Sequence, residues 1–374
     1  MFNRLVCIVF LLVPWIVAYR SPVQGQPAEE HASFIVQTLR IPMKEASPNG
    51  LEALLVRPNE IGPFPLAVIT HGTTSRALER AAMTPQRMLP IALEFARRGW
   101  ATVVVMRRNY GASGGQYAES MFSCDYPDYM HSAKESSRDL RAAIAHLSTL
   151  PEVDPRRILA VGPSGGGLAV VALTAEPPLG LVAGINFAGG WGHIAPDTVC
   201  QPGNLLSTFW VLGKKSRIPM LWVYATNDHF IKADLAESLY QQFTEAGGKA
   251  TFIAAPPYGN EGHSLFTIQG IPVWTGYVDS FLKTQSLVLR PQLLPIPAVP
   301  HVPIPEGLTP SGLNAFKLYL ALPNEKAFAI GSDGSWGCQF GRRTLPVAEK
   351  EAMEYCAKHS IKCRIVMLND ISIH

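Results

Sequence analysis

The 374-residue sequence has few charged side chains, few cysteines and no recognisable internal repeat. Charged residues make up 16% of the chain and the net charge is only +3, so composition indicates neither a nucleic-acid partner nor an acidic membrane partner. The six cysteines include no C-x-x-C pair and the histidines are not paired, so the sequence predicts no metal site. Hydrophobic residues, at 47%, are numerous enough for a large α/β core with a smaller unit beside it.

The N-terminal stretch has the pattern of a secretion signal. Arg4 supplies a positive charge, Leu5 to Ala18 form an apolar run that is short for a membrane span, and Val23-Gln-Gly25 offers a cleavage site. We therefore expect residues 1–25 to be a signal peptide and the mature protein to be periplasmic or secreted, with no membrane span after cleavage. An uncleaved anchor is the alternative.

Export permits disulfide bonds, and the cysteines beyond the signal fall into two candidate pairs. Cys124 and Cys200 lie in two long irregular segments that follow strands on the same side of the expected sheet. Cys356 and Cys363 flank the end of a helix and the start of a strand. We hypothesise a disulfide within each pair, which leaves Cys338 as a free thiol.

Short apolar runs alternate with helical patterns along the first three quarters of the chain. This alternation predicts a doubly wound, mostly parallel α/β sheet, whose ligands bind beyond the carboxyl ends of the strands. The segment 192–217 is expected to be a long loop or cap. Strands are expected at 33–40, 51–57, 66–70, 101–106, 158–161, 181–187, 220–225 and 250–254, and helices at 88–98, 132–150, 233–246 and 271–283.

Prolines divide the chain near its end. Seven prolines between Pro291 and Pro310 predict a stiff, extended linker over residues 285–310. This linker separates a main domain, residues 26–284, from a small C-terminal α+β module, residues 311–374. The module carries no acid/base constellation, and its sequence identifies no partner.

The stretch from Arg157 to Leu173 is the most informative in the chain. It reads as a buried strand, the turn Gly162-Pro-Ser164-Gly-Gly166 and a helix of small apolar residues. A serine on such a G-x-S-x-G turn is strained, with its hydroxyl exposed, and the helix N-terminus favours negative charge beside it. We therefore predict Ser164 as a nucleophile; a plain glycine-rich loop is the alternative.

A serine nucleophile needs a base, which is usually a histidine oriented by a carboxylate. His263 lies in a Gly/Asn-rich loop after the last strand of the main domain, and Asp228 ends the strand before it. The order serine, acid, histidine is typical of this architecture. A surface histidine and a helix N-cap are the alternatives for these two residues, and Asp234 is the reserve acid.

An oxyanion needs two backbone amides, for which we predict Gly165, the residue after the nucleophile, and Thr73, with Thr74 as second choice. Aromatic residues follow several strands on the same side and either line a substrate pocket or pack in the core. They are Tyr110, Phe122, Tyr126, Trp191 and Phe230.

With these motifs, residues 33–284 resemble the α/β-hydrolase superfamily, in its dienelactone-hydrolase-like and prolyl-oligopeptidase-like branch. The resemblance implies an eight-stranded sheet and acyl-enzyme chemistry without a cofactor. Dienelactone hydrolases themselves resemble cysteine enzymes, whereas Ser164 occupies the nucleophile position here, which favours a plain serine esterase. The matching residues are His71-Gly72, Arg108 to Gly111, Gly162 to Gly166, Asp228 and Gly262-His263.

We therefore expect an exported serine hydrolase that acts on a small-molecule carboxylic ester. A serine peptidase of the prolyl-oligopeptidase-like branch ranks lower, because such enzymes often carry an N-terminal propeller and only a short segment precedes the first expected strand. A binding protein that acts through its C-terminal module is the alternative from another class.

Overall fold

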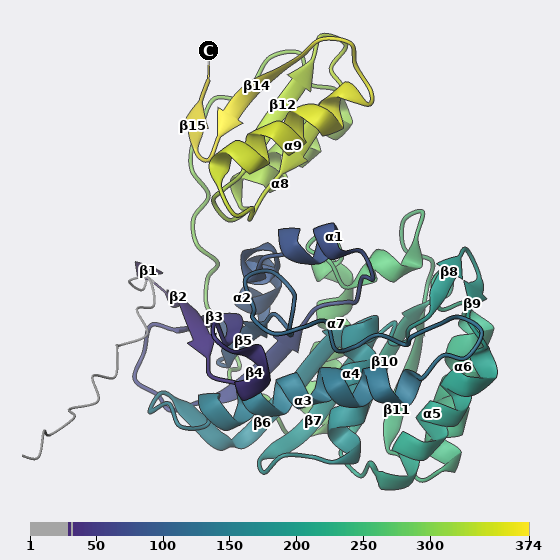
Figure 1. Cartoon of the computed structure of the whole chain (residues 1–374). Helices are drawn as coiled ribbons and strands as arrows, with labels where there is room; N and C mark the ends of the chain where they lie inside the picture. Colours follow the sequence, from purple (N-terminus) through teal and green to yellow (C-terminus); the bar gives the residue numbers. More distant parts are fainter. Residues whose placement is uncertain (1–28, 31–32, 374) are drawn as a thin grey trace, which may run out of the picture.

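Eight strands form one sheet, in the order β2-β3-β5-β4-β6-β7-β10-β11, and the two-residue β1 (Glu29–Glu30) extends it beyond β2. The computed structural model that shows this sheet describes residues 29–30 and 33–373 (Figure 1). The predicted signal peptide, residues 1–25, lies outside the described residues. The eight strands are β2 (Phe34–Ile41), β3 (Leu51–Pro58), β4 (Phe64–Thr70), β5 (Ala101–Val105), β6 (Val153–Pro163), β7 (Leu181–Phe187), β10 (Met220–Ala225) and β11 (Ala250–Ala255).

The sheet is mostly parallel. β3 runs antiparallel to β2 and β5, and every pair from β5 to β11 is parallel. The prediction of a doubly wound, eight-stranded α/β sheet is confirmed. Its helices are α1 (Ala77–Ala82), α2 (Leu89–Arg97), α3 (Tyr129–Leu147), α4 (Gly165–Ala175), α5 (Pro202–Lys215), α6 (Ala233–Glu245) and α7 (Ile271–Thr284).

The central strands are apolar on both faces because each face packs against helices. In β5, Val103 and Val105 belong to the core shared with α3, α4, α5 and α6, whereas Val104 belongs to the core shared with α2 and α7. Side chains of a strand alternate between its faces, so an uninterrupted apolar run is what a sheet covered on both sides requires.

The segment 192–217 is more ordered than a long loop. It contains the hairpin of β8 (His193–Ala195) and β9 (Thr198–Val199), followed by the fourteen-residue helix α5. Helix α5 buries Leu205, Phe209 and Leu212, which lie on one helical face. A proline in the first turn and this apolar spacing were the signals for the helix.

The C-terminal module is a four-stranded antiparallel sheet in the order β13-β12-β14-β15, with two helices. The hypothesised disulfide between Cys356 and Cys363 is present and joins the end of its second helix to β14. The module comprises α8 (Pro310–Leu320), β12 (Ala327–Gly331), β13 (Trp336–Gln339), α9 (Leu345–Ala357), β14 (Cys363–Leu368) and β15 (Ile371–Ser372).

Between Thr284 and Pro310 the chain has neither helix nor strand, and it runs alongside α2. The backbone N–H of Leu294 donates to the carbonyl of Arg97 at 3.1 Å, and Arg97 Nε donates to the carbonyl of Leu294 at 2.8 Å. These two bonds attach the proline-rich segment to the end of α2.

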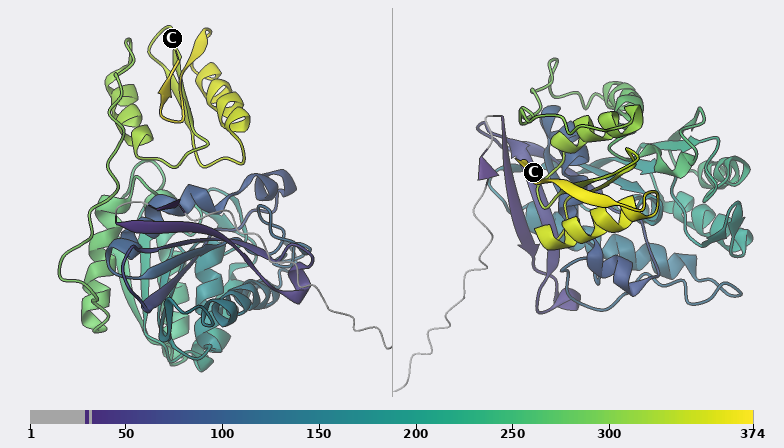
Figure 2. Two further views of the ribbon diagram at one scale, coloured as in Figure 1. Left: turned by 90° about the vertical axis from the view of Figure 1, so that its left-hand side faces the viewer. Right: turned by 90° about the horizontal axis from the view of Figure 1, so that it is seen from above.

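The module lies over the end of the main sheet that carries α1 (Figures 1 and 2). Arg343 of the module donates to both carboxylate oxygens of Glu52, at 2.5 and 2.6 Å, and to the carbonyl of Met83 at 2.6 Å. Glu52 is only 8% exposed and also accepts the N–H of Ala112. These bonds, here called the Arg343 clasp, fasten the module at the carboxyl-end edge of the parallel strands.

Among the residues that the structure describes, no helix combines the length and the apolar character needed to cross a bilayer.

Replacing Arg343 with Ala leaves the buried Glu52 carboxylate without its counter-charge, so we expect the free energy of unfolding to fall by about 2–3 kcal/mol. Urea denaturation measures this loss, and limited proteolysis between residues 286 and 309 is expected to become faster. Lys215→Ala is the control, because its pair with Glu176 is exposed and its loss costs less than about 0.5 kcal/mol. Unchanged stability and unchanged proteolysis of Arg343→Ala would contradict the clasp.

Candidate active site

The turn after β6 holds Ser164 in a strained backbone conformation. Ser164 has φ of 55° and ψ of −128° and stands at the N-terminus of α4. Its N–H donates to the carbonyl of Phe187 at 2.9 Å, and its own carbonyl accepts the N–H groups of Leu168 and Gly190. Because a non-glycine residue at positive φ is costly, these bonds on both sides maintain the conformation.

The glycines on each side of Ser164 allow a close approach of three backbone segments. A Cβ on Gly162 would lie 2.3 Å from the carbonyl oxygen of Gly166, and a Cβ on Gly166 would lie 2.4 Å from that of His71. A side chain on Gly162 would push the end of β6 away from the start of α4, and a side chain on Gly166 would push the turn away from the loop after β4. The G-x-S-x-G pattern is therefore a packing requirement as well as a motif.

Gly165 and Thr73, the two residues predicted to supply oxyanion amides, are in contact. A Cβ on Gly165 would lie 2.0 Å from Thr73 Oγ1 and 3.4 Å from Thr73 N. Gly165 is the first residue of α4, so its N–H has no acceptor within the helix. Within residues 29–30 and 33–373, no group accepts the N–H of Thr73.

His263 and Asp228 form a hydrogen-bonded pair. His263 Nδ1 lies 2.9 Å from Asp228 Oδ2, with His263 on η3 (Gly262–Leu265) after β11 and Asp228 directly after β10. The Asp228 side chain is fully buried, and its other oxygen accepts the N–H groups of Phe230 and Ile231 at 2.8 and 2.9 Å. Asp228 therefore orients the imidazole and also shapes its own loop.

Glu261 ties together the two loops that carry this pair. One of its carboxylate oxygens accepts the backbone N–H of His229 and that of His263, each at 3.0 Å. Asp234, the reserve acid, instead pairs with Lys232 and accepts the N–H of Leu235 in the first turn of its own helix. Ser164, Asp228 and His263 thus all follow carboxyl ends of parallel strands, at one edge of the sheet.

The aromatic residues predicted near the site differ in their surroundings. The Phe230 ring is stacked between two imidazoles, 4.4 Å from that of His263 and 4.0 Å from that of His193. Burial, with a further contribution from His263, lowers the pKa of His193. Trp191 is half-buried against the core that contains α5. Phe230, which is 37% exposed, therefore presents an aromatic surface beside His263.

Tyr110, which the sequence predicts either to line a substrate pocket or to pack in the core, packs in the core. It is fully buried, its ring packs 4.3 Å from that of His71, and its hydroxyl accepts the N–H of Thr74 at 3.3 Å. Tyr110 therefore supports the loop after β4 from below instead of lining a pocket.

A buried ionic cluster beneath the same loop was not predicted from the sequence. Arg107 is fully buried and pairs with Glu119, which is 3% exposed and lies outside any helix or strand. Both contact Thr73 Oγ1, at 3.1 and 2.9 Å. Neither residue belongs to a recognised motif, and nothing in the sequence distinguished Glu119 from Asp125 and Asp128, the other acids of the same irregular segment.

The segments around the site are covalently linked. The second hypothesised disulfide, between Cys124 and Cys200, is present, and Cys338 is a free thiol. The hydroxyl of Tyr129 donates to the carbonyl of Cys200, and the N–H of Cys200 donates to that of Gly192. This linkage fixes the irregular segment before α3 against the β8–β9 hairpin.

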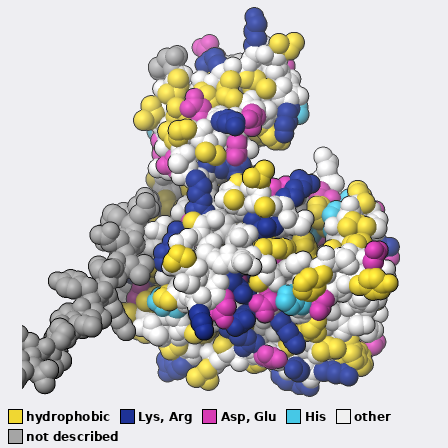
Figure 3. Space-filling model, in the orientation of Figure 1, with side chains coloured by type: hydrophobic (Ala, Val, Ile, Leu, Met, Phe, Trp, Pro, Cys, Tyr) yellow, Lys and Arg dark blue, Asp and Glu magenta, His cyan; other side chains and the backbone are white. Residues whose placement is uncertain are grey.

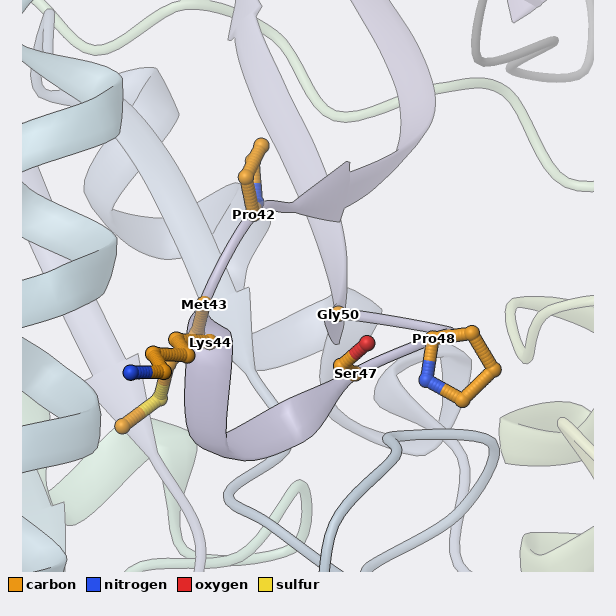
Figure 4. Close-up of a pocket in the computed structure, with 6 residues that line it drawn as sticks. All are labelled: Pro42, Met43, Lys44, Ser47, Pro48 and Gly50. Carbon is orange, nitrogen blue, oxygen red and sulfur yellow. The ribbon is translucent and has the colours of Figure 1, made fainter.

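Two hollows of the surface lie apart from these residues. One, of about 360 Å³, lies in the turn between β2 and β3 and is lined by Pro42, Met43, Lys44, Ser47, Pro48 and Gly50 (Figure 4). A larger one, of about 930 Å³, lies between the module and the main part of the chain, where Figure 3 shows a waist. In the described part of the chain, His, Cys, Asp and Glu side chains form no group of three or more suited to a metal.

Comparison with known proteins identifies the family. The model of the dienelactone hydrolase family matches residues 52–280, which contain the whole of this site. The chain belongs to the dienelactone hydrolase family.

One relative matches a shorter part of this dienelactone hydrolase family member. The quorum-quenching protein AidA of Acinetobacter baumannii is 30% identical over 124 residues, which cover 33% of this chain and 35% of AidA. The chain thus matches only about a third of the length of this relative.

Solved structures share its fold. An acetyl xylan esterase from Paenibacillus sp. R4 has a TM-score of 0.51 at 15% identity, covering 72% of this chain and 90% of that one. Esterase 2 of Thermogutta terrifontis, phosphorylated by paraoxon, has a TM-score of 0.50 at 15% identity, covering 68% and 96%. At these identities the likeness concerns the α/β-hydrolase fold.

The buried His71 predicts a loss of stability in acid. Burial, together with the neighbouring Arg107 guanidinium, holds the pKa of His71 well below 6.5. Below about pH 6.5 the unfolded chain therefore binds a proton that the folded chain does not, so stability falls as the pH falls, by up to about 1.4 kcal/mol per pH unit from this group.

Urea denaturation from pH 7 to pH 5 measures this slope, which we expect to be smaller in His71→Gln. His301→Gln, at an exposed linker histidine, is the control and should keep the wild-type slope. Equal slopes in His71→Gln and wild type would show that His71 does not carry the effect.

Proposed function

We propose that this protein is an exported serine hydrolase that cleaves small-molecule carboxylic esters through Ser164, His263 and Asp228. The observation that carries the proposal is the 2.9 Å contact between His263 Nδ1 and Asp228 Oδ2, at the sheet edge where the strained Ser164 turn also stands. The chain order serine, acid, histidine and membership of an ester-hydrolase family support it.

In this mechanism Ser164 Oγ attacks the ester carbonyl while His263 Nε2 accepts its proton. Asp228 accepts the hydrogen bond of Nδ1–H, which leaves Nε2 as the basic nitrogen and stabilises the imidazolium that forms. The N–H groups of Gly165 and Thr73 donate to the oxyanion of the tetrahedral intermediate.

The intermediate then collapses, and His263 delivers its proton to the departing alkoxide. Water attacks the resulting acyl-enzyme by the same route, with His263 again as base, and releases the acid and Ser164. The catalytic groups of this mechanism are Ser164, His263, Asp228 and the two backbone amides, and water is the second nucleophile.

Export is part of the proposal. The N-terminal charge and apolar run of the sequence support it, as do the two disulfides, which form and persist in oxidising compartments. The division into a catalytic domain, 26–284, a linker, 285–310, and a module, 311–374, belongs to the same proposal. It is supported by the stretch without helix or strand between Thr284 and Pro310.

The test is covalent labelling by a fluorophosphonate together with hydrolysis of p-nitrophenyl acetate. Ser164→Ala should abolish both, because the attacking oxygen is removed. His263→Ala and Asp228→Asn should keep the fold and lower kcat by about 10⁴-fold.

His229→Ala is the matched control, because this neighbouring exposed histidine pairs with Asp197 outside the proposed machinery and should keep wild-type kcat. Full labelling of Ser164→Ala, or undiminished turnover in His263→Ala, would overturn the assignment. Hydrolysis of p-nitroanilide amides as fast as esters would instead favour a peptidase.

A further inference from the structure

Glu119 is a buried carboxylate to which the mechanism above gives no role. Its Oε2 atom accepts hydrogen bonds from Thr73 Oγ1 at 2.9 Å and from Arg107 Nη2 at 3.0 Å, and lies 2.8 Å from Ser136 Oγ. Its Oε1 atom accepts Arg107 Nε at 3.1 Å. The hydroxyl of Ser132 donates to its backbone carbonyl at 2.9 Å, so the whole residue is held in place.

Arg107 connects this carboxylate to the backbone of the loop after β4. Its Nη1 donates to the carbonyl of His71 at 2.6 Å and to Thr70 Oγ1 at 2.7 Å, and its Nη2 donates to the carbonyl of Gly72 at 3.3 Å. Each residue from Thr70 to Thr73 is therefore bonded to the Arg107–Glu119 pair.

The bonds to Thr73 have a fixed direction. A carboxylate only accepts hydrogen bonds, so the Thr73 hydroxyl must donate to Glu119, and its oxygen is then free to accept from Arg107 Nη2. Two hydrogen bonds thus hold the Thr73 hydroxyl in place. The backbone N–H of the same residue lies next to Gly165.

We propose that Glu119 is a positioning residue for ester hydrolysis, acting through Thr73 and Arg107 to aim the Thr73 N–H at the oxyanion. This inference rests on the proposed function, since it needs the Thr73 amide in the oxyanion hole. An oxyanion donor is effective only at about 2.7–3.1 Å from the developing charge. A small tilt of the loop therefore weakens binding of the transition state more than binding of the substrate. The effect is therefore expected in kcat and not in KM.

The chain provides a matched control one residue further on. Arg108 forms a comparable buried pair with Asp139, at 2.6 Å from Nε to Oδ1, and Asp139 is 2% exposed. Asp139 also accepts the N–H of Arg108, but neither residue bonds to the segment from Thr70 to Thr73. Disrupting this pair shows how much stability and activity are lost when any buried ion pair in the loop after β5 is broken.

The experiment compares four variants of the full chain: Thr73→Val, Thr73→Ser, Glu119→Gln and Asp139→Asn. Thr73→Val keeps the amide and the size of the side chain but loses the hydroxyl. The readouts are kcat and KM for p-nitrophenyl acetate, the rate of fluorophosphonate labelling, and the thermal midpoint of each variant.

We expect Thr73→Val and Glu119→Gln to lower kcat and the labelling rate by about 10- to 100-fold with KM within about two-fold, because positioning is lost while substrate contacts remain. Thr73→Ser should be at least about five-fold faster than Thr73→Val, since it restores the donor to Glu119. Asp139→Asn should lower the thermal midpoint and leave kcat near that of the wild type.

Wild-type kcat in Thr73→Val, or an equal loss of kcat in Asp139→Asn, would overturn the positioning role of Glu119. Even if Glu119→Gln does not fold, the comparison of Thr73→Val with Thr73→Ser tests the positioning role. If Ser164→Ala retains activity, the proposed function itself fails; if Ser164→Ala is inactive and Thr73→Val is not impaired, only the role of Glu119 fails.

Discussion

The close contact between the Ser164 turn and the loop after β4 is the constraint on which the rest of the site depends. The glycines on either side of Ser164 allow backbone atoms to meet where a methyl group would collide. The turn is held by hydrogen bonds to Phe187, the last residue of β7, and to Gly190 in the loop that follows it. Backbone strain at Ser164 is thus maintained by ordinary hydrogen bonds to the segments around it, and Ser164 is the residue that we propose as the nucleophile.

Two consecutive arginines divide the support of this edge. Arg107 turns inward to Glu119 and to the loop that contains Thr73, whereas Arg108 turns to Asp139 on α3. The two consecutive side chains have different partners, so this Arg-Arg pair holds both the loop after β4 and helix α3. Two buried ion pairs therefore hold the segments around the site in place, and the apolar sheet below is the scaffold.

The sequence allowed the strands, most helices, the disulfide pairs and the family to be predicted, because those features depend on local pattern and on short motifs. Glu119 could not be predicted, since its partners are 12 to 46 residues away and only the fold brings them together. Tyr110 shows the same limit, because an aromatic residue after a strand has one pattern whether it is buried or exposed. Helix α5 carried a local signal at Leu205, Phe209 and Leu212, but its position in a connecting segment concealed it.

The Arg343 clasp also has a consequence for the order of folding. It joins residues 291 positions apart, Glu52 on an early strand and Arg343 in the module. Chains emerge from their N-terminus, and domains fold as units while they emerge. Glu52 is therefore synthesised, and its strand paired, long before its counter-charge exists. A main sheet that forms before the module is made has this carboxylate open to water, and docking of the module then buries it against Arg343.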